Sequence, residues 1–379
     1  MADANKTTII IAHNTAKYLL MHYRQLLVEF NQKFDRVICV TPKDGHHKEF
    51  DGLGCEFHPI KMQQHGMNPL QEWRLVKQFL AIYRQYQPDC VLNFSMKPCL
   101  YGGYAAKKLN VPKAGYMVTG LGYVFLASGM KASILKRLVI KQYTKNLRSK
   151  DDVFFQNKDD AQLFSDLGIT SQANSHVLPG TGIDLDQFKS TPQRNEEIDK
   201  VRFLFIGRML KDKGVYELVK ACYALRKRGV RFQCDLLGPL DTNPSGIQRK
   251  ELIEWQKKGL IRYLGEVPDV RSRIAKSHVF VLPSYREGLP RAGLEAMAMG
   301  LPVITSDAPG CREIVDDGKN GFLIAAERST PLAKAMKKFV DDKSLIQSMG
   351  ARSRVICEEQ FSVEIMVNMV RSAMLKPVE

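Results

Sequence analysis

The chain has 379 residues, of which 44% are hydrophobic and 25% charged. Single hydrophobic cores rarely grow past about 250 to 300 residues, so two domains are expected. No run of 18 or more apolar residues is present, and the start "MADANKTTIIIAHN" lacks the basic, apolar and small-residue segments of a secretion signal. We therefore expect no membrane span and a protein that stays in the cytoplasm.

Charge and cysteine content narrow the possible partners. Eight cysteines are scattered without a C-x-x-C pair, which argues against a disulfide framework and a thiolate metal site. The net charge is +16, and residues 61–150 hold fifteen Lys or Arg against two acids, a net of +13 for that stretch. A surface this basic needs an anionic partner, and nucleic acid, phosphorylated substrate and anionic lipid headgroups all qualify.

In the first half, short apolar runs alternate with longer amphipathic segments. The helix expected over 68–86 has Leu70, Trp73, Val76, Phe79, Leu80 and Tyr83 on one face. Apolar runs predict strands at 7–12, 36–40, 90–94, 113–118 and 152–156. Alternating strands and helices predict a parallel, doubly wound α/β sheet.

A polar, proline-containing stretch at 188–200 interrupts this pattern, which restarts at 201–207. We therefore predict an amino-terminal domain over 1–190 and a carboxyl-terminal domain over 195–360. Further strands are expected at 231–238, 261–265, 278–284, 302–306 and 321–326. Two such Rossmann-like domains would face each other across a central cleft at the carboxyl ends of their sheets, where open α/β sheets bind ligands.

The segment "FLFIGRMLKDKGVYELVKA" (203–221) reads as a buried strand, a loop and an amphipathic helix. Its loop carries Gly207-Arg208 and Lys213-Gly214. Glycine allows close approach of a ligand to the backbone, and two cations at the mouth of this loop suit a diphosphate. The alternative is a pair of solvated surface charges.

A second segment, "SYREGLPRAGLEAMAMG" (284–300), turns through Glu287, Gly288, Leu289 and Pro290 into a helix that carries Glu295. Amide groups at the helix start would attract a phosphate. The Glu295 carboxylate suits the two hydroxyls of a ribose, and Glu287 could accept hydrogen bonds from a hexose. Alternatively, Glu287 is a capping-region acid and Glu295 a solvated helix residue.

These two segments, together with "GLPVITSDAPGCREIVDDGKNGFL" (300–323), closely resemble family 4 glycosyltransferases, which are retaining enzymes of the GT-B fold. The resemblance covers the whole chain and implies a C-terminal helix, 361–379, that returns to the amino-terminal domain. It implies that Arg208 and Lys213 bind the diphosphate of a UDP-sugar, that Glu295 binds its ribose and that Glu287 contacts the transferred sugar. The donor set it implies comprises Gly207, Arg208, Lys213, Val267, Glu287, Gly288, Leu289, Pro290 and Glu295.

The amino-terminal half resembles the bacterial transferases that build O-antigen, capsule or N-glycan precursors on undecaprenyl diphosphate, including an N-acetylgalactosaminyltransferase of the N-glycan pathway. The segments that carry this resemblance are 11–27, 93–112 and 117–143. It implies an undecaprenyl-diphosphate-linked glycan as acceptor and GalNAc as the first choice of sugar. The acceptor-binding residues expected are Asn14, Thr15, Lys97, Thr119 and Gly120. One departure from the pattern is "QQHGMNP" (63–69), where such enzymes can carry an arginine before Asn-Pro.

His13 follows the first strand, so its ring could reach the cleft and join Arg208, Lys213 and Glu287 as a catalytic residue. A structural histidine is an equally good interpretation. The sequence "DLD" (184–186) matches the D-x-D metal signature of another glycosyltransferase fold, but it does not end a buried strand. Acids of a turn or helix start are the better interpretation, so we expect no cofactor and no essential metal.

The charge distribution also supports a lipid-linked acceptor. In 131–150, Leu135, Val139, Tyr143 and Leu147 recur every four residues, and Tyr123 and Phe125 lie just upstream. Such a basic amphipathic helix can lie among anionic inner-leaflet lipids, which would make the protein peripheral at the cytoplasmic face of a bacterial inner membrane. The alternative is a core helix with a solvated outer face. The cations on the opposite arc are Lys131, Arg137, Lys141, Lys145 and Arg148.

Other functions fit the sequence less well. A nucleotide-dependent dehydrogenase needs G-x-G-x-x-G after the first strand, which "IIIAHNTAKYLL" lacks. A sugar-nucleotide epimerase on the same scaffold is a closer alternative. A basic nucleic-acid-binding protein is the non-enzyme alternative, but aromatic residues interleaved with the cations are not evident, so no nucleic acid is expected.

Overall fold

The computed structural model describes residues 7–63, 68–121, 125, 129–190, 198–241, 243 and 245–376. The chain forms two compact units, one of Met1–Thr181 with Glu364–Glu379 and one of Gly182–Val363. The two units therefore divide between Thr181 and Gly182, which is earlier in the chain than the boundary that the sequence predicts at the polar stretch 188–200. The reason is that Ile183 forms a bridge with Ser362, and Phe188 is buried in the core of the second unit.

The first unit contains a seven-stranded sheet in the order β3-β2-β1-β4-β5-β6-β7. All neighbouring strands are parallel. The five strands predicted for this half are confirmed, whereas β3 and β7 were missed because these short edge strands lack an apolar run. The strands are β1 (Thr8–Ala12), β2 (Arg36–Thr41), β3 (Glu56–Pro59), β4 (Cys90–Phe94), β5 (Lys113–Val118), β6 (Asp152–Phe155) and β7 (Ser175–Val177).

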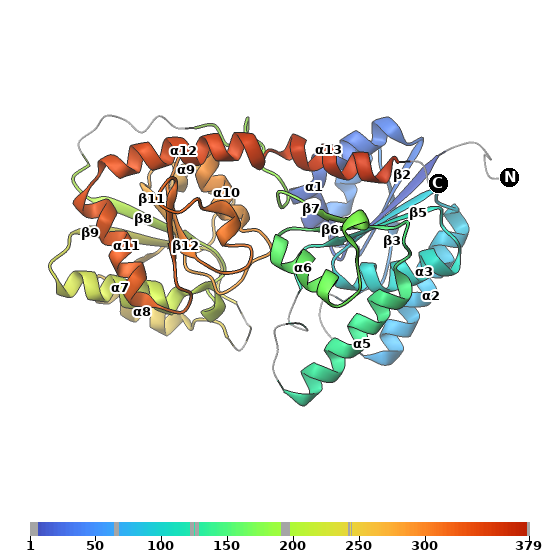
Figure 1. Ribbon diagram of the computed structural model, residues 1–379, viewed down its shortest axis with the longest axis horizontal. Helices are drawn as coiled ribbons and strands as arrows, with labels where there is room; N and C mark the ends of the chain where they lie inside the picture. Colours follow the sequence, from blue (N-terminus) through green and yellow to red (C-terminus); the bar gives the residue numbers. More distant parts are fainter. Residues whose placement is uncertain are drawn as a thin grey trace. The chain divides into compact units, whose positions relative to one another are not determined.

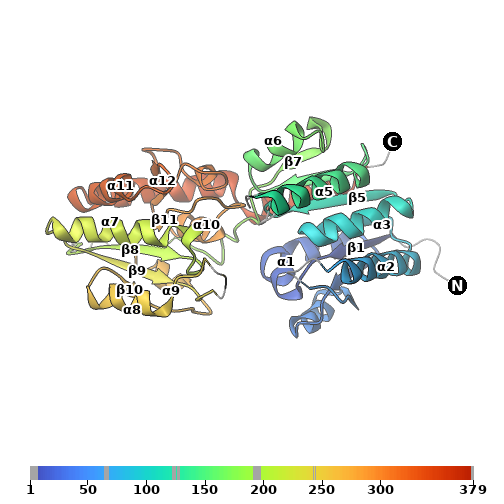
Figure 2. The same cartoon turned by 90° about the horizontal axis from the view of Figure 1, so that it is seen from below.

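Helices cover both faces of this sheet. Figure 2 shows α2, α3 and α5 side by side on one face, where their buried residues share one core with residues of α6. On the other face lie α1 and α13 (Figure 1), which are joined by an ion pair of 2.7 Å between Arg371 and Glu29. The expected return of the C-terminal helix to the amino-terminal unit is thus confirmed. The helices are α1 (Ala16–Lys33), α2 (Pro69–Tyr86), α3 (Gly103–Lys108), α5 (Met130–Asn146), α6 (Lys158–Asp166) and α13 (Val363–Met374).

The buried face of α2 differs from the prediction. Leu70 and Trp73 were expected to share the apolar face but are exposed, and the Lys77 ammonium lies 3.5 Å from the centre of the Trp73 ring. Leu75 and Ile82 are buried instead, beside the correctly predicted Phe79, Leu80 and Tyr83. The first turn of α2 therefore extends past the edge of the core.

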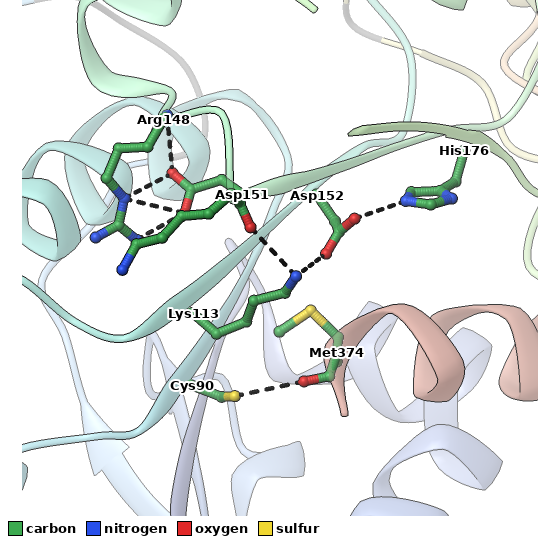
Figure 3. Close-up of polar contacts among 8 residues, drawn as sticks. Cys90, Lys113, Arg148, Asp151, Asp152, His176 and Met374 are labelled. Atoms are coloured by element: carbon green, nitrogen blue, oxygen red, sulfur yellow. Dashed lines mark hydrogen bonds and ion pairs between the residues drawn. The ribbon is translucent and has the colours of Figure 1, made fainter. Parts of the chain in front are cut away.

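An ionic network ties the starts of three strands together at the amino-terminal edge of this sheet (Figure 3). The Asp152 carboxylate of β6 pairs with the Lys113 ammonium of β5 at 2.5 Å and contacts the His176 ring of β7 at 2.7 Å. Burial opposes ionisation of Asp152, but the hydrogen bonds from His176 and Lys113 outweigh it and hold its pKa below the ordinary value. The network stabilises the edge of the sheet opposite to the expected ligand site.

The second unit contains a six-stranded parallel sheet in the order β10-β9-β8-β11-β12-β13. Each of its strands was predicted. They are β8 (Val201–Ile206), β9 (Phe232–Leu237), β10 (Arg262–Tyr263), β11 (Val279–Leu282), β12 (Val303–Ser306) and β13 (Gly321–Ile324).

Helices again lie on both faces, with α7, α8 and α11 on one side and α9, α10 and α12 on the other (Figure 1). Both units are therefore doubly wound, as the sequence predicts. The helices are α7 (Val215–Lys227), α8 (Arg249–Lys257), α9 (Arg271–Ile274), α10 (Arg291–Ala298), α11 (Ser329–Asp341) and α12 (Ser344–Gln360).

Candidate active site

Two loops meet at the carboxyl edge of the second sheet, because their strands β8 and β11 are neighbours. The backbone N–H of Tyr285 donates to the carbonyl oxygen of Asp212 (2.8 Å), and the Ser284 hydroxyl donates to the same oxygen (3.1 Å). Gly214 has φ +72°, and a Cβ there would lie 2.0 Å from the Pro283 carbonyl oxygen. Only glycine allows the loop after β8 to pass this close to the loop after β11.

This approach brings together two of the predicted site residues. The Lys213 ammonium lies 2.6 and 2.7 Å from the two carboxylate oxygens of Glu287, although 74 positions separate the residues. Both side chains are largely buried, with 19% and 12% of their surface exposed. Charge-assisted hydrogen bonds of this length are the strong ones, so the pair fixes both side chains at one place.

The backbone of Glu287 is held from the other side by the loop after β12. Its N–H donates to the Pro309 carbonyl oxygen at 3.0 Å. Gly310 has φ +75°, and a Cβ there would come within 2.4 Å of the carbonyl oxygens of both Glu287 and Gly288. The "APG" of the 300–323 motif thus supports the turn that presents Glu287.

Arg208 extends from the same edge but has a different partner. Its guanidinium donates to the Asp241 carboxylate at 2.8 Å, and the Arg208 side chain is 59% exposed. The other oxygen of Asp241 accepts from the backbone N–H of Asn243 at 2.8 Å, which fixes the carboxylate in a turn. Sequence reasoning did not include Asp241, since nothing in the motif links it to Arg208.

Glu295 lies in the second turn of α10 and is largely buried. Arg291, one helical turn earlier, donates through Nε to its carboxylate at 3.0 Å, and the two side chains are 24% and 14% exposed. Burial raises the pKa of Glu295, although Arg291 opposes this. Pro290 caps the helix with φ −75° and ψ 96° instead of occupying its first turn.

The remaining donor residues come from the same edge. Val267 follows β10, and both Val267 and Leu289 pack partly buried against the core of this unit. Gly207 follows β8, and a Cβ on its neighbour Gly238 would lie 2.0 Å from the Gly207 carbonyl oxygen. All predicted donor residues are therefore found near carboxyl strand ends or in α10. Of the charged ones, Lys213 and Glu287 pair with each other, whereas Arg208 pairs with Asp241 and Glu295 pairs with Arg291.

The predicted acceptor residues lie at the carboxyl edge of the first sheet. His13 is buried after β1, and its Nδ1 accepts from the backbone N–H of Thr15 at 3.0 Å. Burial lowers the pKa of His13 to about 4. The ring is therefore neutral near pH 7 and carries its proton on Nε2, as a donor and not as a cation. Thr15 caps α1 through its hydroxyl, and Asn14 lies half-buried between them.

Lys97 was predicted to meet an acceptor diphosphate, but its ammonium is already paired with Glu72 of α2 at 2.6 Å. Both side chains are largely buried. Nearby, Ser95 has φ +67°, and its hydroxyl lies 3.5 Å from that of Thr119. Gly120, with φ +139°, follows. A non-glycine residue in the left-handed region is uncommon and marks this strand end as constrained.

The expected membrane helix, α5, has its predicted apolar stripe turned inward. Val139 and Tyr143 are buried, and Leu135 and Leu147 pack against the core of the first unit. A second stripe, missed from the sequence, faces outward instead. It consists of Met130, Ile134 and Leu138, which are 81%, 54% and 55% exposed.

The cations predicted for this helix divide into two groups. Arg137, Lys141 and Lys145 are exposed beside the outward stripe. Arg148 differs from these, because it lies beyond α5 and pairs with the buried Asp151 at 2.6 Å. Phe125 also differs from the prediction, since it is half-buried and stacks on Phe164. Tyr123, the Lys131 side chain and most of the 63–69 segment lie outside the described residues.

The D-x-D segment belongs to a turn. One carboxylate oxygen of Asp184 accepts from the backbone N–H groups of Asp186 at 3.0 Å and Gln187 at 2.8 Å. Among the residues that the structure describes, no group of three or more His, Cys, Asp or Glu side chains could hold a metal ion. Independence from metal stays a prediction.

Two family matches cover most of the chain. Residues 9–157 match the family described as "Glycosyl transferase 4-like", and residues 186–355 match "Glycosyl transferases group 1". The first match ends just after β6, so it leaves out only β7 of the first sheet, and the second match contains the whole sheet of the second unit.

Similar proteins agree with these matches. The chain is 25% identical over 337 residues to N,N'-diacetylbacillosaminyl-diphospho-undecaprenol alpha-1,3-N-acetylgalactosaminyltransferase of Campylobacter jejuni, covering 86% of this chain and 88% of that protein. It is 25% identical over 353 residues to the capsular polysaccharide biosynthesis glycosyltransferase CapM of Staphylococcus aureus, covering 89% of each.

The fold matches a solved structure over nearly its full length. HepE of Anabaena, in complex with UDP, superposes with a TM-score of 0.77 at 18% identity and covers 97% of this chain and 98% of that one. Within the described parts of this chain, no helix is both long and apolar enough to span a membrane.

Proposed function

We propose that this chain, which matches glycosyl transferase families over residues 9–157 and 186–355, moves a hexose from a UDP-sugar to a saccharide carried on undecaprenyl diphosphate. The observation that carries the donor half of this proposal is the contact between Lys213 and both carboxylate oxygens of Glu287. A cation for phosphate and an acceptor for sugar hydroxyls are thereby held side by side at the carboxyl edge of a parallel sheet, where such sheets bind ligands.

In the proposed reaction, breaking the bond from the anomeric carbon to UDP builds negative charge on the departing β-phosphate. Arg208 and Lys213 would stabilise this charge, together with the amino-terminal end of α10, where the helix dipole favours an anion. A single preorganised donor of this kind lowers the activation free energy by about 3 to 4 kcal/mol. Glu287, released from Lys213 when phosphate binds, would accept hydrogen bonds from the sugar.

We propose that the acceptor hydroxyl attacks from the face that UDP leaves, and that an oxygen of the leaving phosphate takes its proton. The configuration at the anomeric carbon is then retained. NMR of the product tests this step, because a β-linked product from an α-linked donor contradicts it. No metal is required in this scheme, since Arg208 and Lys213 supply the positive charge, and activity should persist in excess chelator.

The acceptor proposal rests on the activity of the similar Campylobacter enzyme and on the basic charge of the first unit. GalNAc is the first sugar to test. The experiment incubates the protein with a panel of UDP-sugars, with and without an undecaprenyl-diphosphate-linked acceptor, and separates transfer, hydrolysis and epimerised donor. Transfer from one UDP-sugar supports the proposal, whereas epimerisation without an acceptor favours the alternative enzyme.

We further propose that the outward face of α5 rests on anionic inner-leaflet lipids, so that the protein is peripheral at the membrane. Apolar Met130, Ile134 and Leu138 would enter the headgroup layer, and each flanking cation adds about 1 kcal/mol against an anionic surface. The exposed first turn of α2 lies on the same face of the sheet (Figure 2).

Vesicle sedimentation tests this surface. The double variant Ile134→Ser, Leu138→Ser is expected to bind phosphatidylglycerol-containing vesicles at least about tenfold more weakly, because each side chain loses on the order of 1.5 kcal/mol of burial. Ile253→Ser, at an exposed apolar residue of α8 in the other unit, is the control and should bind as the unchanged protein does. Equal binding by all three proteins, or preferential binding to RNA, contradicts the proposal.

A further inference from the structure

Glu295 is the proposed ribose ligand, yet its surroundings disfavour a charged carboxylate. Its side chain is only 14% exposed, and burial raises its pKa. The Asp269 carboxylate adds a negative potential from the loop before α9. A carboxylate that accepts hydrogen bonds from two ribose hydroxyls must stay ionised, because a protonated carboxyl group loses acceptor capacity.

Arg291 is the cation that counters these effects at Glu295. It sits four residues earlier on α10 and reaches the carboxylate with Nε at 3.0 Å. The same guanidinium donates through another nitrogen to the Gly182 carbonyl oxygen at 3.3 Å. This second contact anchors the guanidinium outside its own helix, so the pair is more constrained than an ordinary exposed pair at this spacing, which contributes only about 0.3 to 0.5 kcal/mol.

The planar guanidinium can also orient its partner. A bond through Nε to one carboxylate oxygen holds the carboxylate plane, while the other oxygen is left to accept from a ligand. Lysine at the same position would supply the charge without this planar geometry. Charge and orientation are therefore two separable contributions of Arg291.

We propose that Arg291 is a positioning residue for nucleotide recognition: it keeps Glu295 ionised and oriented to accept hydrogen bonds from the ribose hydroxyls. This inference rests on the proposed function, because it requires that Glu295 meets a ribose. It assigns a role to a residue that follows the Gly-Leu-Pro turn and that sequence reasoning passed over, although the (i, i+4) spacing of opposite charges was a visible signal.

The test compares the affinities of UDP and 2′,3′-dideoxy-UDP by calorimetry. A buried acceptor left unpaired by the analogue should make the unchanged protein prefer UDP at least about tenfold. Arg291→Met should bring this preference to within about threefold of unity, and Arg291→Lys should restore part of it. The double variant Arg291→Met, Glu295→Gln should prefer UDP over the analogue no less than Glu295→Gln alone does. The reason is that the two substitutions remove the same interaction with the ribose.

Two controls separate this role from a structural one. Lys337→Met breaks an exposed (i, i+4) pair with Asp341 on α11 of the same unit and should leave the preference for UDP unchanged. Thermal unfolding of every variant checks that it is folded, and Arg291→Lys keeps the test open if Arg291→Met unfolds.

The outcomes are distinct. If Arg291→Met and Arg291→Lys keep the full preference of the unchanged protein, the inference is overturned while the proposed function stands. If the unchanged protein binds UDP without distinguishing the analogue, Glu295 does not read the ribose and the inference falls with that assignment. If the unchanged protein does not bind UDP, the proposed function itself fails.

Discussion

Neutralising Lys213 and Glu287 one at a time should have opposite effects on UDP affinity. At an effective dielectric of about 20, a pair of unit charges about 4 Å apart attracts by roughly 4 kcal/mol, most of which is cancelled by desolvation. Hydrogen bonds to charged groups retain about 1.5 to 3 kcal/mol. UDP must compete with Glu287 for the Lys213 ammonium, which lies 2.6 and 2.7 Å from the two carboxylate oxygens.

Glu287→Gln should therefore bind UDP about tenfold more tightly than the unchanged protein, since about 1.5 kcal/mol of competing attraction is removed. Lys213→Met should weaken UDP binding and lower kcat by about 100- to 1,000-fold, the loss expected for one donor to a developing anion. Glu287→Gln should lower kcat too, because the sugar loses a hydrogen-bond acceptor.

Calorimetry with UDP and steady-state turnover with the preferred UDP-sugar measure these changes. Lys211→Met is the matched control, because Lys211 is an exposed lysine of the same short turn and should change neither quantity by more than about twofold. If Glu287→Gln weakens UDP binding as much as Lys213→Met does, the two residues act together on the nucleotide and the reasoning from competition is refuted.

Two further predictions concern stability. Gly214 has φ +72°, and Gly214→Ala would place a Cβ 2.0 Å from the Pro283 carbonyl oxygen. Gly229 has a similar φ of +73°, but a Cβ there would have no atom within 4 Å. Gly229→Ala should therefore cost only the backbone strain of about 1 to 2 kcal/mol, and Gly214→Ala clearly more, with weaker UDP binding; equal unfolding midpoints in urea would contradict the close approach. Asp152→Asn should cost about 3 to 5 kcal/mol near pH 7, because Lys113 is left in a buried site without its carboxylate. Since the folded pKa of Asp152 is depressed, its contribution is complete above the unfolded value of about 3.9 and is lost as pH falls through the folded pKa. The difference in melting temperature between the two proteins should therefore shrink in acid, and a difference that is constant down to acidic pH would contradict this.

Local sequence patterns were sufficient for most of the elements and for selecting the candidate donor residues, whose roles stay predictions. Most of the buried strands are rich in apolar residues, and the loops after β8 and β11 carry glycine, proline and charged residues at fixed offsets. Such signals are local, because backbone propensity and apolar run length act over a few residues. The short strands β3 and β7 were not predicted, since their composition does not favour a strand and they form only by pairing with a neighbouring strand.

Tertiary structure decided which side chains face which partner. In α5, the stripe of Leu135 and Val139 and the stripe of Ile134 and Leu138 both recur every four residues, so periodicity alone could not tell the core from the surface. Packing against the sheet resolved this, because only one arc of a helix can be buried there. The partners of Lys213, Lys97 and Arg208 were equally hidden. Their carboxylates lie 74, 25 and 33 positions away, and the order of strands in a sheet, which brings such distant loops together, is set by the packing of the whole chain.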